Sequence, residues 1–137
     1  MTSLMLMLVL MFSSISQSTL VAYQTWDALS WEYHLPPLSI RHDTLDGDGL
    51  ALNYGVDAQG RAVIVMDPKM ESLSTEQVRK TIAHEAVHTM LRQRGMAYTI
   101  SEEITANEFA FCWLRDSYYI PRTSCPDVLN QFKLEHR

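Results

Sequence analysis

The segment that most constrains the fold is residues 74–95, which carries the signals of one long helix. Ser74 is a typical N-cap residue, and Gln77 three positions later completes a capping box. Gly95 is typical of the residue that follows a helix, and Arg92 stands in the last turn, where a cation is favoured. The predicted buried side is an apolar stripe at helical spacing, formed by Val78, Ile82, Ala86 and Met90. We therefore expect a helix whose other side faces a neighbouring element.

Two histidines lie on that other side, in the sequence His84-Glu85-Ala-Val-His88. Residues four apart share a helix face, so both imidazoles can approach one metal ion while Glu85 projects beside them. A chance match to H-E-x-x-H in a chain of this composition occurs about once in a hundred, and the helix signals around it raise its weight. The alternative is a pair of surface histidines on an amphipathic helix.

A metal ion that activates water normally takes three protein ligands, so two histidines leave the site incomplete. Further candidates lie in residues 101–116, which predict a second helix with Ser101 or Thr99 as its N-cap. The connection from Gly95 to Ile100 is short, which predicts that the two helices pack antiparallel. Residues of the second helix can then face the histidines of the first.

Glu103 is the expected third ligand, because it falls at the centre of the apolar side of the second helix. A carboxylate buried there needs a metal ion or another cation. Asn107, one turn later on the same face, could hydrogen-bond an imidazole or the Glu103 carboxylate. Glu102 falls near the rim, where a solvated charge that favours the helix dipole explains it, and Cys112 falls on the predicted solvent side. Glu108 is the alternative third ligand, and the remaining alternatives are Glu102 or no carboxylate of this helix.

The two segments together resemble the gluzincin metallopeptidases, in which H-E-x-x-H on one helix is followed by a ligand Glu on the next. The string Glu103-Ile-Thr-Ala-Asn-Glu-Phe-Ala110 is similar to the second helix of compact members, including the ImmA/IrrE-type metallopeptidases. The resemblance covers about Ala62 to Leu114. It implies a small zincin-like α+β fold, a Zn²⁺ cofactor and a peptide or protein substrate. Nineteen residues, 89–107, separate His88 from Glu108, which is the thermolysin-like spacing and supports Glu108.

The implied chemistry is peptide-bond hydrolysis by a zinc-activated water, with Glu85 as general base. The alternative function is a catalytically weak or inactive zinc-binding regulatory or interaction module of the same fold. Retention of Glu85 favours hydrolysis, since a purely structural zinc site gains nothing from a base. Candidates for a second donor to the developing oxyanion, each competing with an ordinary packing or surface role, are Tyr98, Tyr118, Tyr119 and Arg122.

The segment before the H-E-x-x-H helix predicts a short sheet and an N-terminal helix. Tyr23 to Tyr33 is the expected helix, with its aromatic side chains, Trp31 among them, in the core. Residues 35–45 predict an extended segment, and Asp46-Gly-Asp-Gly49 predicts a turn. Residues 50–56 and 61–66 predict a hairpin. The resemblance implies that the strand Ala62 to Met66 forms the upper wall of the cleft and can pair with an extended peptide.

Length and charge limit the remaining possibilities. The 137 residues can bury one core, so residues 17–137 are expected to form a single domain. The net charge of −5 and the lack of a Lys/Arg cluster in the sequence argue against nucleic acid as a partner.

The amino terminus predicts export. Leu4 to Phe12 is an unbroken apolar run followed by serine-rich sequence, so residues 1–16 are interpreted as a signal peptide of an extracytoplasmic or secreted protein. A cationic start is missing, and the alternatives are an uncleaved membrane anchor over Leu4 to Ala22 or a buried first helix in a cytoplasmic protein. In an exported protein, Cys112 and Cys125 could form a disulfide, and in a cytoplasmic protein they would be free thiols.

Overall fold

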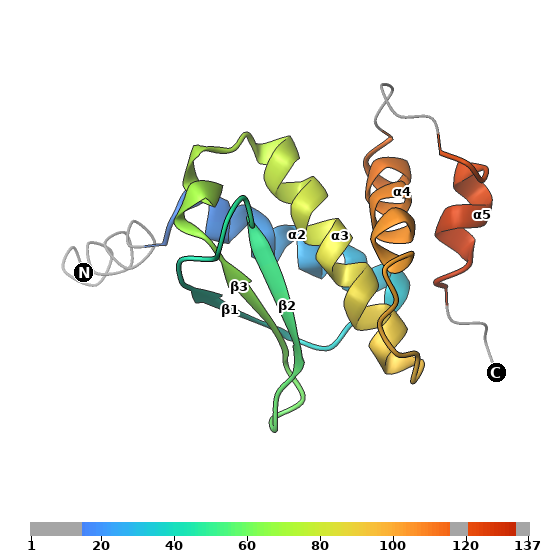
Figure 1. The fold of residues 1–137 in the computed structure, drawn as a ribbon, viewed down its shortest axis with the longest axis horizontal. Helices are drawn as coiled ribbons and strands as arrows, with labels where there is room; N and C mark the ends of the chain where they lie inside the picture. The colour runs from blue at the N-terminus through green and yellow to red at the C-terminus, as the bar shows by residue number, and fades with distance from the viewer. Residues whose placement is uncertain (1–14, 116–120, 134–137) are drawn as a thin grey trace, which may run out of the picture.

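The computed structural model describes residues 15–115 and 121–133 and shows a small α+β fold with a three-stranded mixed sheet (Figure 1). This confirms the predicted fold class at the level of α+β. The elements in chain order are α2 (Gln17–Tyr33), β1 (Leu38–His42), β2 (Ala51–Val56), β3 (Ala62–Met66), the 3₁₀ helix η1 (Pro68–Ser72), α3 (Thr75–Gln93), α4 (Glu102–Leu114) and α5 (Cys125–Asn130).

The sheet has the order β1-β3-β2, with β1 parallel and β2 antiparallel to β3. The predicted hairpin is confirmed: β2 and β3 are joined by a tight loop in which the Asp57 N–H donates to the Arg61 carbonyl at 2.9 Å. The expectation that Ala62–Met66 pairs with a peptide is wrong, because β3 is the central strand and both of its edges are already paired. Among the described strands, β1 and β2 are the edge strands, and β2 is the one that packs against α3.

The core lies between one face of the sheet and the helices. Ala62, Ile64 and Met66 of β3 are fully buried against α2 and α3. On the other side α3 packs against α4, and α4 packs against α5 (Figure 1). Because α3 is covered on several sides, its predicted apolar stripe from Val78 to Met90 is buried, as expected.

Helix α2 is longer than predicted and begins after the Ser16 N-cap, whose side chain accepts from the Thr19 N–H. Trp26 is buried as predicted, and its indole N–H donates to the Pro36 carbonyl at 2.7 Å. The placement of Trp31 in the core is wrong, since its side chain is 87% exposed. Trp31 lies five residues after Trp26, about 140° around the helix, so a helix that buries Trp26 must point Trp31 outward.

The signals that bound α3 act as predicted. The Ser74 and Gln77 side chains form the capping box, and Gly95 takes a left-handed φ of 74° directly after the Arg94 C-cap. That conformation is accessible to glycine at low cost and reverses the chain, so that the Met96 N–H donates to the Leu91 carbonyl at 3.1 Å. The following segment therefore turns back along α3, and α4 runs beside it.

The buried face of α4 differs from the predicted one. Glu103 was expected at its centre, but the face is centred near Phe109, about 120° around the helix. Glu102 and Cys112 are buried rather than solvated, whereas Ile104 is 39% exposed. The reason is that α3 and α5 cover two adjacent sides of α4, and the periodicity of one helix does not report how many neighbours it has.

Helix α5 is fixed to α4 by a disulfide between Cys112 and Cys125. Phe132, just after α5, is buried against Phe109 with their ring centroids 5.3 Å apart. The expectation that Cys112 faces solvent is therefore wrong, and the disulfide left open by the sequence is present. Disulfides persist mainly in oxidising compartments, which is compatible with the export prediction.

The signal-peptide prediction for residues 1–16 falls almost entirely outside the described residues, as do Tyr118 and Tyr119. It therefore stays a prediction. Among the helices in residues 15–115 and 121–133, none is long and apolar enough to cross a membrane.

The predicted turn at Asp46–Gly49 is present, with the Gly49 N–H donating to the Asp46 carbonyl at 3.4 Å.

The packing of α4 predicts that Phe109→Ala will lower the free energy of unfolding by about 3–5 kcal/mol, because a fully buried aromatic ring leaves a cavity. Urea unfolding followed by circular dichroism measures the change. Ile104→Ala on the same helix is the control and should cost less than about 1 kcal/mol, since Ile104 is partly exposed. Similar losses in the two variants would contradict the observed orientation of α4.

Candidate metal centre

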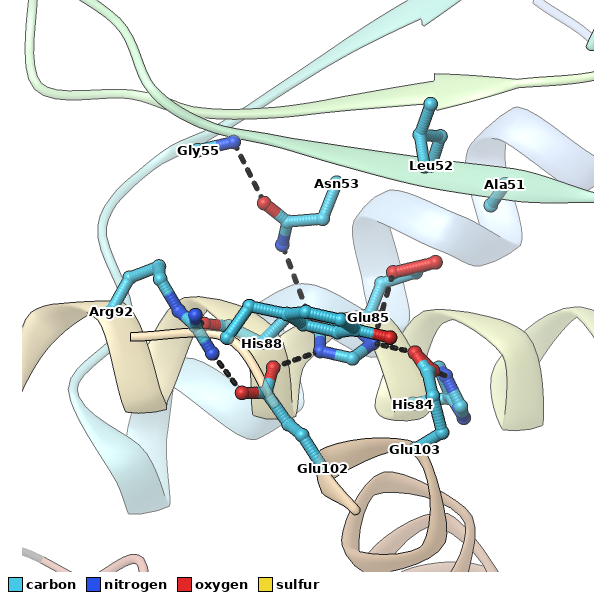
Figure 2. A pocket seen from close by; sticks show the side chains of 11 residues that line it. Ala51, Leu52, Asn53, Gly55, His84, Glu85, His88, Arg92, Glu102 and Glu103 are labelled. Atoms are coloured by element: carbon cyan, nitrogen blue, oxygen red, sulfur yellow. Dashed lines mark hydrogen bonds and ion pairs between the residues drawn. The ribbon is translucent and has the colours of Figure 1, made fainter. Parts of the chain in front are cut away.

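The two histidines of α3 lie one helical turn apart on the side of the helix that faces α4. Their imidazole ring centroids are 5.1 Å apart. One potential ligand atom from each of His84, Glu85 and His88 lies within 4.8 Å of the others, so this group could hold a metal ion. Figure 2 shows these side chains beneath β2, with the start of α4 on their other side.

Glu103, from the first turn of α4, joins the two histidines. One carboxylate oxygen lies 3.3 Å from His84 Nε2 and the other lies 3.0 Å from His88 Nε2. Its side chain is 38% exposed, so it reaches the histidines from the edge of the buried face rather than from its centre. Two imidazole nitrogens and a carboxylate that converge on one point are a ligand set suited to a divalent metal ion.

Asn107 contacts the far nitrogen of one histidine, as the sequence predicted for an imidazole on that side. Its Oδ1 lies 2.7 Å from His84 Nδ1. If the amide oxygen accepts, His84 Nδ1 carries the proton and Nε2 keeps its lone pair free for a metal ion. Burial lowers the pKa of His84, although the Asn107 hydrogen bond opposes the shift. The half-buried position of His84 thus favours the neutral imidazole, which is the form that binds metals.

Glu102 contacts the second histidine, a contact that the sequence analysis did not predict. Its side chain is 3% exposed, and its carboxylate contacts both His88 Nδ1 and the guanidinium of Arg92. The interpretation of Glu102 as a solvated first-turn charge is therefore wrong. Arg92 was a usable signal, because it lies one turn after His88 on the same side of α3 and can compensate a buried carboxylate.

Glu85 lies beside the imidazoles, with one carboxylate oxygen 3.9 Å from His88 Nε2. Its side chain is buried, and this burial, reinforced by the negative charge of Glu103, raises the pKa of Glu85 to about 8. Arg92 is the only lysine or arginine among the described residues that line the surrounding cavity, and it is paired with Glu102. A metal cation would supply the compensating positive charge that no lysine or arginine of the described cavity wall offers to the Glu85 and Glu103 carboxylates.

The histidines open into a cavity of about 570 Å³ between β2 and the start of α4. Asn53 fixes β2 to α3, since its amide donates to the Glu85 carbonyl at 3.0 Å and its oxygen accepts from the Gly55 N–H at 2.8 Å (Figure 2). The same amide donates to Thr89 Oγ1 at 2.7 Å. The sequence analysis did not find Asn53, which lies far from the motif along the chain. The cavity is lined by Ala51, Leu52, Asn53, Gly55, His84, Glu85, His88, Arg92, Tyr98, Glu102 and Glu103.

The remaining candidates divide into those that line the cavity and those that do not. Tyr98 lines it, with its ring centroid 6.2 Å from that of His88. Two other candidates that the structure describes, Glu108 and Arg122, do not line the cavity. Glu108 is buried on another side of α4 and accepts a hydrogen bond from the Arg122 backbone N–H at 3.3 Å. The geometry therefore favours Glu103 over Glu108 as a partner of the two histidines.

Comparison with known proteins returns no match for this chain, whether against protein-family models, curated proteins or solved structures. The resemblance to gluzincins therefore rests on the two sequence motifs alone.

The buried Glu85 predicts a pH-dependent loss of stability in the metal-free protein. Unfolded Glu85 ionises near pH 4.5, whereas the folded protein holds the proton to about pH 8. The contribution of Glu85 to the free energy of unfolding is thus intact below pH 4.5 and falls as pH rises towards about 8. Above about pH 8 it no longer changes. The fall is at most about 1.4 kcal/mol per pH unit. Glu85→Gln should remove it, as urea unfolding at a series of pH values would measure.

Glu76→Gln, at an exposed position near the start of the same helix, is the matched control and should keep the pH profile of the unsubstituted protein. Added metal ion should flatten that profile, since a nearby cation favours the ionised carboxylate. The burial argument would fail if Glu85→Gln and Glu76→Gln lost stability in parallel between about pH 4.5 and 8.

Proposed function

We propose that this protein is a zinc-dependent peptidase that cleaves peptide bonds of a peptide or protein substrate. The observation that carries the proposal is the convergence of His84, His88 and Glu103 in an accessible cavity, with the Glu85 carboxylate beside them. Two histidines and a glutamate are a known ligand set of catalytic zinc, and such a set leaves a position for water. A structural site would more often be closed by a fourth protein ligand.

In this proposal the residues around the metal ion have distinct roles. A bound zinc ion would lower the pKa of a water molecule and polarise the scissile carbonyl. Glu85 accepts a proton from the attacking water and passes it to the leaving amine. Asn107 orients His84, and Glu102 orients His88 while Arg92 compensates the charge of Glu102.

The cavity also offers groups that could hold a substrate. The free edge of β2 can pair with the backbone of an extended peptide, the mode of recognition in which a peptide adds a strand to a sheet. Tyr98 is the candidate donor to the developing oxyanion that lies in the cavity wall. Both elements face the same space as Glu85, so a bound peptide would lie between them and the base.

The ligand assignment predicts that Glu103→Ala will lower zinc affinity by more than about 100-fold, since removing an outer hydrogen-bond partner of a ligand alone costs about 10–100-fold. Glu102→Gln should show that smaller loss, because it weakens only the group that orients His88. Competition with a chelator of known zinc affinity measures both.

Glu108→Ala is the control and should bind zinc as tightly as the unsubstituted protein, because Glu108 lies on another side of α4. Full zinc affinity in Glu103→Ala, together with its loss in Glu108→Ala, would assign the third ligand to Glu108.

The role of Glu85 predicts that Glu85→Gln will keep its zinc and lose hydrolysis by at least about 100-fold, since general base catalysis contributes about 10²–10⁴-fold. The measurement is cleavage of an unfolded protein by the zinc-loaded enzyme, with a chelator-treated sample as control. Zinc binding without any cleavage by the unsubstituted protein would instead favour the regulatory or interaction module.

A further inference from the structure

Tyr33, the last residue of α2, carries a polar group that the fold leaves without a partner. Its side chain is 2% exposed, yet its hydroxyl makes no hydrogen bond. It is the only such buried side-chain oxygen or nitrogen in residues 15–115 and 121–133. A hydroxyl that leaves water without gaining a partner destabilises the folded protein. The Tyr33 hydroxyl is therefore a candidate contact for a molecule from solution.

Tyr33 also forms part of the wall of a second cavity, which shares no residue with the cavity at the metal centre. This cavity lies where α2 and α3 end, next to the residues that follow α5 (Figure 1). Its volume is about 160 Å³. An engineered cavity of about 150 Å³ in another protein binds benzene, so a molecule of that size has room here. The lining residues are Tyr33, His34, Met90, Gln93, Arg94 and Phe132.

The wall of this second cavity combines apolar side chains with hydrogen-bond donors. Met90 and Phe132 are buried and offer apolar contact. The hydroxyl of Tyr33, the amide of Gln93 and the guanidinium of Arg94 can all donate. Among the described residues of the wall there is no Asp or Glu. The wall therefore suits a ligand that has an apolar body and carries acceptor oxygens.

Two of these donors are available to a ligand at neutral pH. Burial, together with the negative charge of Glu32, raises the pKa of Tyr33 to about 12, so its hydroxyl keeps the proton. Glu32 itself does not line the cavity. One nitrogen of Arg94 donates to the Gln131 carbonyl at 2.8 Å, and the guanidinium carbon lies 5.4 Å from the centroid of the Phe132 ring. A guanidinium has five N–H groups, and those left over by this contact can meet a carboxylate.

We propose that the second cavity binds a small monocarboxylate with a flat apolar body. Its carboxylate accepts hydrogen bonds from Tyr33 and Arg94, and its body packs between Met90 and Phe132. Water in the cavity would satisfy the hydroxyl but would gain nothing from the apolar walls. Because the hydroxyl is closed off from solvent, the ligand reaches it as the long side chains of Gln93 and Arg94, both exposed residues, turn aside.

The test titrates the full chain with benzoate in a calorimeter and uses benzamide as the uncharged probe of similar shape. Benzoate should bind at least about fivefold more tightly, since hydrogen bonds to a charged acceptor are about twice as strong as those to a neutral one. A carboxylate can also bind a metal ion, so the titration is repeated with a chelator. The affinity for benzoate should stay the same, because the metal centre shares no residue with this cavity.

Tyr33→Phe removes the hydroxyl alone and should weaken benzoate binding at least about tenfold, the worth of a hydrogen bond to a charged group. Without benzoate, the same variant should keep or raise the midpoint of urea unfolding, because the hydroxyl has no partner to lose. Tyr54→Phe is the matched control, since Tyr54 is 63% exposed and does not line the cavity. It should change neither measurement.

Arg94→Met should lower the affinity for benzoate to about that for benzamide, because it removes the cation and keeps an apolar side chain. Arg41→Met is its control, since Arg41 is an exposed residue of β1 that does not line the cavity. It should leave both affinities unchanged.

Three results would overturn the inference. The first is no binding of benzoate, or binding that a chelator abolishes. The second is an affinity for benzoate that Tyr33→Phe and Arg94→Met leave unchanged. The third is a lower urea midpoint for Tyr33→Phe without benzoate, because the hydroxyl would then have a partner within the folded protein. None of these results depends on peptidase activity, so the inference and the proposed function fail separately.

Discussion

The antiparallel contact between α3 and α4 is the constraint on which the rest of the site depends. Gly95 reverses the chain after α3, and the small side chains of Ala106 and Ala110 are buried where α4 packs. Their size lets two helices approach closely, so that the first turn of α4 lies beside the middle of α3. Both His84 and His88 therefore meet carboxylates that are far from them along the chain. Without this contact, the H-E-x-x-H sequence would be two histidines on a helix surface.

The arrangement of charges in the site does not favour folding when no cation is bound. Three glutamates gather around two imidazoles, and in the described part of the cavity wall Arg92 compensates only Glu102. Burial of Glu85 opposes folding in the absence of a cation, because the unfolded chain ionises this carboxyl more easily. Functional sites commonly carry such a cost, and a metal ion bound beside Glu85 would offset it.

The local features of the fold were predictable from sequence because they depend on neighbours along the chain. The caps of α3, the reversal at Gly95 and the β2–β3 hairpin each involve residues within a few positions of one another. The Trp31 error was local, because helix geometry already separates Trp31 from Trp26, and the other errors concern what packs against an element. The predicted buried side of α4 was wrong because α5 covers a second face of that helix. The prediction of a free edge on β3 was wrong because β1, which is far from β3 along the chain, pairs with that edge.

The sequence by itself determined the two histidines, the glutamate between them and the short list of carboxylates that could complete the site. Helical periodicity is a local property, and it suffices to put His84 and His88 on one side of α3. Only the tertiary structure decided which groups meet them: Glu103 rather than Glu108 beside the imidazoles, and Glu102 against His88. Asn53 reaches α3 from a strand more than thirty positions earlier. These contacts depend on how helices and strands are rotated against one another, which the pattern of a single element does not contain.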